Sequence, residues 1–249
     1  MENIEIKGGS LQVKKRIWEL DAFRGLFVIG MVVVHLIYDL QSFAGLPVLQ
    51  NSVIYEFVAR WGGVLFFLIS GICVTLGSHP VRRGLIVLGC GIVVSAVTIG
   101  LYLVNFADVS IIIYFGVLHC LGSCMLLWPL LKKCHWLVPA VLAAVIIPVG
   151  LWLDTQNFST GLWLVPFGFV PKEFSSSDYF PLLPNLGFFL MGVVMGKTLY
   201  KNKTTLFPKI STQNWLVKSL IWIGKWSLPV YMLHQPVLAG IAVILGVLL

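Results

Sequence analysis

The chain has 249 residues, of which 58% are hydrophobic and only 11% are charged, and its mean hydropathy is +0.94. Soluble domains carry roughly a quarter of charged residues, so this composition excludes a water-soluble globule. The aromatic content of 13% excludes a disordered chain. The net charge of +7 is explained by membrane topology, as shown next, and needs no nucleic-acid partner.

Seven apolar stretches are long enough to be membrane-spanning helices, which need about 20 residues. They cover residues 17–40, 61–81, 84–107, 109–131, 134–153, 179–196 and 226–249. The runs are continuous rather than alternating, which favours helices over the strands of a barrel. We therefore predict an all-α, polytopic membrane helix bundle of about seven transmembrane helices. Residues 1–16 form a cytoplasmic segment, and 17–249 form a single transmembrane domain.

The orientation follows from the basic residues. Most of the 17 lysines and arginines fall on the side of the predicted spans that also holds the N-terminus, among them Arg82, Arg83, Lys132 and Lys133. The positive-inside rule then places the N-terminus in the cytoplasm and the C-terminus outside. We expect a multi-pass integral membrane protein, in the plasma membrane if the source is bacterial. The five cysteines match neither a disulfide framework nor a metal site, so no metal is expected.

The first span carries polar residues on one helical face. Asp21, Arg24, His35, Tyr38 and Asp39 recur at intervals of three and four. A charge at the bilayer centre costs about 2.5–3.5 kcal/mol, so these groups indicate partners or a polar cavity. Asp21 and Arg24 are more simply an ion pair that stabilises the fold. His35 and Asp39, one turn apart, predict a hydrogen-bonded pair in which the carboxylate orients an imidazole base.

The later spans and their ends add six polar residues: His119, Asp178, Asn185, Tyr231, His234 and Gln235. His119 is most simply a core histidine with satisfied hydrogen bonds. Tyr231, His234 and Gln235 share a face of the last span, which must therefore face protein or a cavity rather than lipid. Asp178 is expected at the outer mouth, on the same side as His35.

The connecting segments predict surface structure rather than a soluble domain. Segment 154–178 is rich in aromatic residues and predicts a lid in the membrane interface. Residues 211–223, with Trp215, Trp222 and Lys218, have the pattern of a short helix lying on the membrane surface. Gly187, Gly192 and Gly196 predict close helix packing.

Five blocks in order resemble the heparan-α-glucosaminide N-acetyltransferase catalytic-domain family. They are RIWELDAFRG from Arg16 (with His35 and Asp39 after it), FFLISG from Phe66, FGVLH from Phe115, DYFPLLP from Asp178 and SLPVYMLHQP from Ser227. The resemblance implies transfer of an acyl group, most simply acetyl, from cytoplasmic acetyl-CoA. The acceptor would be an amine or hydroxyl, on a carbohydrate or another polar molecule, that reaches the site from outside.

The resemblance and the polar residues together give three expected sets of site residues. The catalytic set is His35, Asp39, His119 and His234, with the choice of base left open. The CoA-binding set is Asp21, Arg24, Arg82 and Arg83, although Arg82 and Arg83 are also explained as ordinary positive-inside charge. The acceptor-binding set is Tyr38, Asp178, Asn185, Tyr231 and Gln235.

Two other functions fit the same pattern. A transporter or flippase for a small polar or lipid-linked solute would use the buried ionisable residues as a binding site or proton relay. A non-catalytic membrane scaffold would not need His35, Asp39, His119 and His234 at all. Membrane lipid is an expected partner in every case, and the glycine-rich helix faces permit a homodimer.

Overall fold

The structure is a computed structural model that describes residues 4–7, 10–13, 16–44, 53–106, 108–156, 158 and 161–248. Lys14 and Lys15 of the predicted cytoplasmic segment lie outside the described residues. The elements follow in the order β1 (Ile4–Lys7), β2 (Ser10–Val13), α1 (Trp18–Ala44), α2 (Val53–Leu76), α3 (Pro80–Leu103), η1 (Val109–Ile111), α4 (Val117–Leu131), α5 (Leu137–Leu153), η2 (Leu162–Phe167), α6 (Leu182–Thr198), α7 (Trp215–Lys225) and α8 (Ser227–Leu248).

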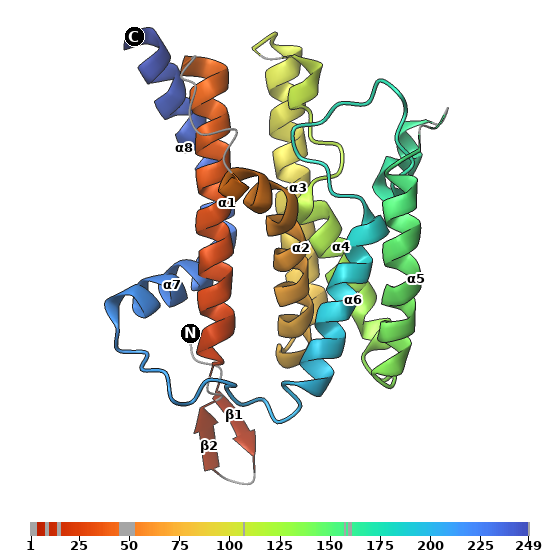
Figure 1. Cartoon of the computed structure of the whole chain (residues 1–249), viewed down its shortest axis with the longest axis vertical. Coiled ribbons are helices and arrows are strands. Elements are labelled where there is room, and N and C mark those ends of the chain that lie inside the picture. Colours follow the sequence, from red (N-terminus) through yellow and green to blue (C-terminus); the bar gives the residue numbers. More distant parts are fainter. Residues whose placement is uncertain are drawn as a thin grey trace.

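The long helices form a bundle, and α7 lies crosswise to it, as do the first turns of α2 (Figure 1). The N-terminal hairpin, the α2–α3 and α4–α5 turns and the α6–α7 connection lie at the same end of the bundle, and the C-terminus lies at the other (Figure 1). We call the end with the hairpin and these connections the basic end, because the first turn of α3 there holds Arg82 and Arg83 and the connections hold Lys132, Lys133 and Lys201. This arrangement is the one that the positive-inside pattern requires.

The helical class that we predicted is confirmed, apart from a short N-terminal hairpin. In the described chain two helical stretches are long and apolar enough to cross a membrane, Trp18–Leu40 and Pro80–Leu103. Four shorter apolar helices accompany them: Trp61–Leu76, Val117–Leu131, Leu137–Leu153 and Leu182–Thr198. These helices correspond to six of the predicted spans.

The start of the predicted span 109–131 is wrong. Helix α4 begins only at Val117 and has 15 residues, about 22 Å at the rise of an α-helix. Residues 109–111 form the short 3-10 helix η1, and the extended backbone after it is bonded by protein: Ser95 Oγ donates to Ile113 O at 2.5 Å and Ser176 Oγ donates to Ile112 O at 2.8 Å. Because neighbouring side chains satisfy these carbonyls, the chain does not need to continue as helix.

The hairpin β1–β2 was not predicted. Its strands pair antiparallel, with Ile4 opposite Val13 and Lys7 opposite Ser10. The alternation of Ile4, Glu5, Ile6 and Lys7 is a strand pattern, but it is much shorter than the apolar runs that dominate the sequence. Two glycines, residues 8 and 9, separate the strands in the sequence, which is a common two-residue hairpin connection.

Glycines let the helices approach closely, as the sequence predicted. Helices α2 and α6 pack together, and a β-carbon on Gly71 would overlap Phe189 O, while one on Gly192 would overlap Leu68 O. Helices α1 and α7 cross in the same way, since a β-carbon on Gly25 would overlap Leu220 O. These contacts are the small-residue packing expected between membrane helices.

Candidate functional site

The centre of the candidate site is a pair of imidazoles from two adjacent helices. Helix α8 packs along α1 and brings His234 against His35, with ring centroids 5.0 Å apart and an interplanar angle of 59°. Tyr231 lies one turn before His234 on α8, and its ring centroid is 5.3 Å from that of His234. The structure therefore brings together two of the four predicted catalytic residues.

The hydrogen bonds of His234 fix its tautomer. Its Nδ1 lies 2.6 Å from the carbonyl oxygen of Tyr231, and a carbonyl can only accept, so Nδ1 carries the proton. The other ring nitrogen, Nε2, is buried and has no hydrogen-bond partner among the described residues. A neutral imidazole with Nδ1 protonated has its lone pair on Nε2. His234 thus presents a free lone pair in a buried place beside His35.

Asp39 is completely buried, but it does not orient His35 as we expected. Both of its carboxylate oxygens accept from Gln235 Nε2, each at 3.2 Å, and no hydrogen bond joins Asp39 to His35 in the described structure. The reason is the position of α8, which presents Gln235 directly to the carboxylate. Gln235 Oε1 is buried and has no partner among the described side chains and backbone. Two orphan acceptors, Gln235 Oε1 and His234 Nε2, therefore sit on consecutive residues.

Asp178 links a third part of the chain to this group. Its Oδ2 accepts from the Val117 backbone N–H and from the Tyr231 hydroxyl, both at 3.1 Å. Gly116 is required here because a β-carbon at that position would overlap the Asp178 carboxylate. Asp178 belongs to the connection before α6, outside the helices, and burial raises its pKa to about 6 although both hydrogen bonds lower it. The first turn of α4, with its free N–H groups, favours the carboxylate at this place.

His119, the fourth predicted catalytic residue, has partners on both ring nitrogens. The Gly116 N–H donates to Nδ1 at 3.2 Å, and Nε2 lies 3.3 Å from Ser95 Oγ. Ser95 donates its own proton to Ile113 O, so its oxygen accepts from His119 Nε2. This is the hydrogen-bonding of a core histidine that joins α3 to α4, which was the simpler of our two interpretations.

Two residues of the expected acceptor-binding set lie apart from the imidazole pair in their contacts. Asn185 is buried and donates from Nδ2 to Pro181 O at 2.8 Å, within the first turns of α6. Tyr38 is 54% exposed, although it neighbours Asp39 in sequence. By contrast, Asp178, Tyr231 and Gln235 of the same set all contact the group around His234.

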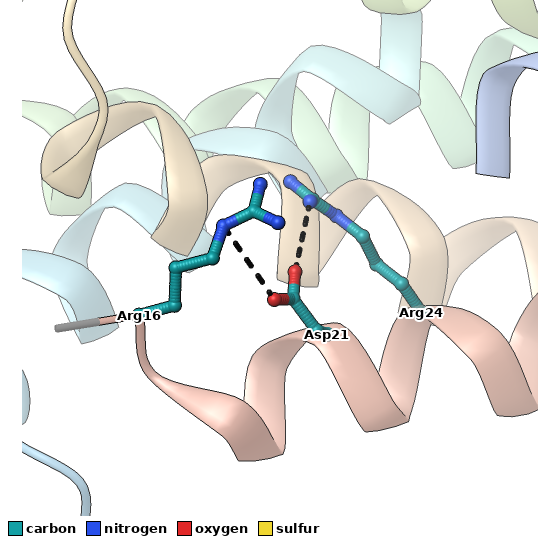
Figure 2. A network of polar contacts seen from close by, with 3 residues as sticks. All are labelled: Arg16, Asp21 and Arg24. Atoms are coloured by element: carbon teal, nitrogen blue, oxygen red, sulfur yellow. Dashed lines mark ion pairs between the residues drawn. The ribbon is translucent and has the colours of Figure 1, made fainter. Parts of the chain in front are cut away.

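At the basic end, Asp21 lies between two arginines (Figure 2). Arg24 Nη1 is 3.8 Å from one carboxylate oxygen and Arg16 Nε is 3.9 Å from the other. These distances exceed hydrogen-bond length, so the guanidinium donors are left for other acceptors. Arg24 and Arg83 also line one narrow pocket of about 20 Å³, together with Cys73, Gly77 and Ser78 among others. Arg16 was not in our predicted set, since a cation just before a span is ordinary interface charge.

The predicted pair Arg82 and Arg83 is divided by the structure. Arg83 faces the narrow pocket with Arg24, whereas Arg82 lines an open groove of about 650 Å³ on the other side of the first turn of α3, with His79, Leu85 and Ile86. Successive helical residues point in directions about 100° apart, which separates the two side chains. Only Arg83 therefore joins Arg24 and Arg16.

Glu19, which we did not single out, is buried beside this cluster and is fully engaged. Its oxygens accept from Thr205 Oγ1 and from the Leu206 N–H, each at 2.8 Å. It therefore ties the α6–α7 connection to α1 and is not a free counter-charge for the arginines. Among the described residues no group of three or more His, Cys, Asp or Glu is placed to hold a metal ion.

The chain was compared with known proteins. A family model described as heparan-alpha-glucosaminide N-acetyltransferase, catalytic, matches residues 16–236. That range begins at Arg16, ends at Pro236, and includes the imidazole pair, Asp178 and the arginines at the basic end. No curated protein and no solved structure showed significant similarity to the chain. Because the match covers most of the sequence, the chain belongs to the heparan-α-glucosaminide N-acetyltransferase catalytic family.

Proposed function

We propose that the protein is an integral membrane acetyltransferase that transfers an acetyl group from acetyl-CoA to an amine or hydroxyl, most simply on a sugar. The observation that carries the proposal is the buried, unpartnered Nε2 of His234 beside the ring of His35, in a chain of this family. Acyl transfer to an amine or hydroxyl requires a base that removes its proton, and a positioned imidazole contributes about 10²- to 10⁴-fold to the rate.

His234 is the base that the geometry favours. Its Nδ1 is held by the Tyr231 carbonyl, so Nε2 is the atom that takes the proton. Asp178 fixes Tyr231 through the hydroxyl, which keeps this turn of α8 against α4. His35 then serves as the neighbouring donor that stabilises negative charge on the reacting carbonyl oxygen, a role worth about 3 kcal/mol in other enzymes. The pattern on the first span favoured His35 as the base, whereas this proposal gives that role to His234.

The acceptor class follows from the two orphan atoms. His234 Nε2 and Gln235 Oε1 are both acceptors of hydrogen bonds, and both are buried without a partner in the described structure. A buried polar atom without a partner costs about 1–3 kcal/mol, which a ligand that donates to it recovers. An amino or hydroxyl group with a neighbouring hydroxyl, as in a sugar, supplies donors to both atoms. Gln235 is in turn held by Asp39, so Asp39 positions it.

The donor site that fits acetyl-CoA is the cluster at the basic end. Arg16, Arg24 and Arg83 converge there with Asp21 as the near counter-charge, and guanidinium groups match phosphate oxygens well. When bound, acetyl-CoA supplies the activated acetyl thioester. Arg24 and His35 share α1 and are separated by about 16 Å along its axis at the helical rise, a span of the order of an extended pantetheine arm.

The proposed topology places donor and acceptor on opposite sides of the membrane. The seven spans are α1 to α6 and α8, and α7 is not a span. Because their number is odd, the N-terminus in the cytoplasm puts the C-terminus outside. The basic end then faces the cytoplasm, where acetyl-CoA is made, and the acceptor reaches His234 from the outer side. The distribution of basic residues supports this orientation.

A transporter is the second candidate, and the group of the half-buried His35 and His234 with the buried Asp39 supports it, because ionisable residues inside a membrane protein commonly line transport paths. One experiment separates the two. Membranes containing the protein are incubated with acetyl-labelled acetyl-CoA and amino-sugar or polyol acceptors. Transfer of label to an acceptor supports the acetyltransferase; uptake of unlabelled solute with no transfer of label contradicts it and supports the transporter.

A further inference from the structure

Helix α7 presents four chemically distinct sides. It begins after Asn214, whose Oδ1 accepts from the Leu216 N–H at 2.9 Å. Its inner side is formed by Val217, Leu220, Ile221 and Gly224, spaced three and four residues apart. Gly224 is buried, and a β-carbon there would overlap the Asp21 carbonyl of α1. Because this side is fixed against α1, the directions of the other three sides relative to the bundle are also fixed.

The side opposite α1 is a stripe of tryptophans. At about 100° per residue, Trp215, Trp222 and Trp226 fall within about 40° of one another. Their side chains are 72%, 61% and 52% exposed, so no described part of the chain covers them. We call these three residues the tryptophan stripe. The preceding connection continues the apolar surface with exposed Leu206, Phe207 and Ile210.

The two flanks of the stripe differ in charge. Lys218 and Lys225 lie on one flank and are exposed, whereas Leu216 and Ile223 lie on the other. Helix α7 runs crosswise to α1 near the basic end (Figure 1), so the two flanks lie on opposite sides of the helix along the direction of the bundle. A helix at a membrane surface needs this division into a cationic and an apolar flank.

We propose that the tryptophan stripe docks into the cytoplasmic surface of a phospholipid bilayer, with anionic headgroups binding Lys218 and Lys225. Tryptophan is enriched at the headgroup level of membranes because its ring is apolar and its N–H is polar. Each lysine near an anionic membrane surface adds to the attraction between the protein and the bilayer. The proposal rests on the membrane location and the orientation in the proposed function, and does not depend on acetyl transfer.

A second copy of the chain is the less favourable occupant. A two-fold contact through the tryptophan stripe, about an axis along the bundle, would bring Lys218 and Lys225 of one copy next to the same basic flank of the other, because that rotation keeps each flank on its own side. Like charges so close together are repulsive. Anionic headgroups instead provide charges of opposite sign along the whole flank.

The test is quenching of tryptophan fluorescence by lipids brominated near the headgroup, with the full-length protein reconstituted in phosphatidylcholine vesicles containing phosphatidylglycerol. We expect the lipid-quenchable emission to fall when Trp215, Trp222 and Trp226 are replaced together by Phe. Trp128→Phe is the matched control, since Trp128 is buried in the core, and its loss should leave the quenchable emission unchanged. Unchanged quenchable emission in the triple variant overturns the proposal. A cross-linked dimer in which the tryptophan stripe is shielded from the brominated lipid also overturns it.

The headgroup part is tested with Lys218→Gln/Lys225→Gln. We expect this double variant to lose the increase in quenching that phosphatidylglycerol gives over pure phosphatidylcholine. Lys132→Gln/Lys133→Gln removes the same charge elsewhere at the basic end and should keep that increase. Equal dependence on phosphatidylglycerol in both double variants would overturn the role of the lysine flank. These measurements read out lipid contact, so a failure of acetyl transfer leaves their meaning unchanged.

Discussion

The rings of His35 and His234 lie 5.0 Å apart, centroid to centroid, although one belongs to the first helix and the other to the last. The contact depends on α8 lying along α1, which places Gln235 on Asp39 in the same turn. A buried carboxylate, an amide and two imidazoles thus meet at one helix–helix interface.

Replacing His234 by Ala should lower acetyl transfer by about 10²- to 10⁴-fold, the usual contribution of a general base. The measurement is the initial rate of label transfer in membranes with equal amounts of folded protein. His135→Ala is the matched control, because His135 is exposed in the α4–α5 turn, and it should keep the full rate. A His234→Ala variant as active as His135→Ala would remove His234 from the proposed role.

Asp39 and Gln235 should be energetically coupled. Removing Gln235 alone leaves a buried carboxylate without its partner, so Gln235→Leu should lower the free energy of unfolding by about 1–3 kcal/mol or more. In a double-mutant cycle with Asp39→Leu, neighbours of this kind show interaction energies of about 0.5–3 kcal/mol. The cycle is measured by unfolding in detergent. Additive effects of the two changes would show that the pair contributes nothing specific.

Gly25→Ala should destabilise the contact between α1 and α7, because the added β-carbon overlaps the Leu220 carbonyl, a backbone atom that cannot move independently. We expect a loss of at least about 1–3 kcal/mol, the usual cost of overpacking. Gly89→Ala is the matched control on α3, where a β-carbon meets nothing within 4 Å, and alanine there should stabilise the helix by up to about 1 kcal/mol. The same change in melting temperature for both variants would contradict this packing.

Arg24→Gln and Arg83→Gln should each raise the KM for acetyl-CoA with a smaller effect on kcat, because the arginines are proposed to bind phosphate far from the reacting carbonyl. Arg82→Gln is the control of equal charge, since Arg82 lines a separate groove. The KM of each variant is measured at saturating acceptor. If Arg82→Gln has the larger effect on KM, the donor site lies at the groove and not at the narrow pocket.

Much of the helical architecture was predictable, because apolar runs of spanning length leave few alternatives. The start of α4 was not predictable, since residues 109–116 are as apolar as the membrane helices. Only the structure shows that Ser95 and Ser176 donate to the carbonyls of Ile113 and Ile112, which therefore need no helical partner. The short hairpin was missed for the opposite reason: its strands are too short to stand out against the long apolar runs.

The candidate site was predictable in its members but not in its pairings. The polar residues of the first and last spans stood out against an apolar background, and the structure brings His35, Asp39, Tyr231, His234 and Gln235 together. The partner of Asp39 depends on the rotation of α8 about its axis, which helical spacing on α1 cannot determine. Spacing suggested His35, four residues before Asp39, whereas α8 supplies Gln235.

The most direct test of the central claim is a sided transfer assay in sealed vesicles. Acetyl-labelled acetyl-CoA is supplied on the side of the basic end, and an amino-sugar acceptor is enclosed on the other side. We predict that labelled acceptor forms inside the vesicles with the unaltered protein and His135→Ala, and at a rate about 10²- to 10⁴-fold lower with His234→Ala. Labelled acceptor that forms equally fast with His234→Ala, or no labelled acceptor with the unaltered protein, would contradict it.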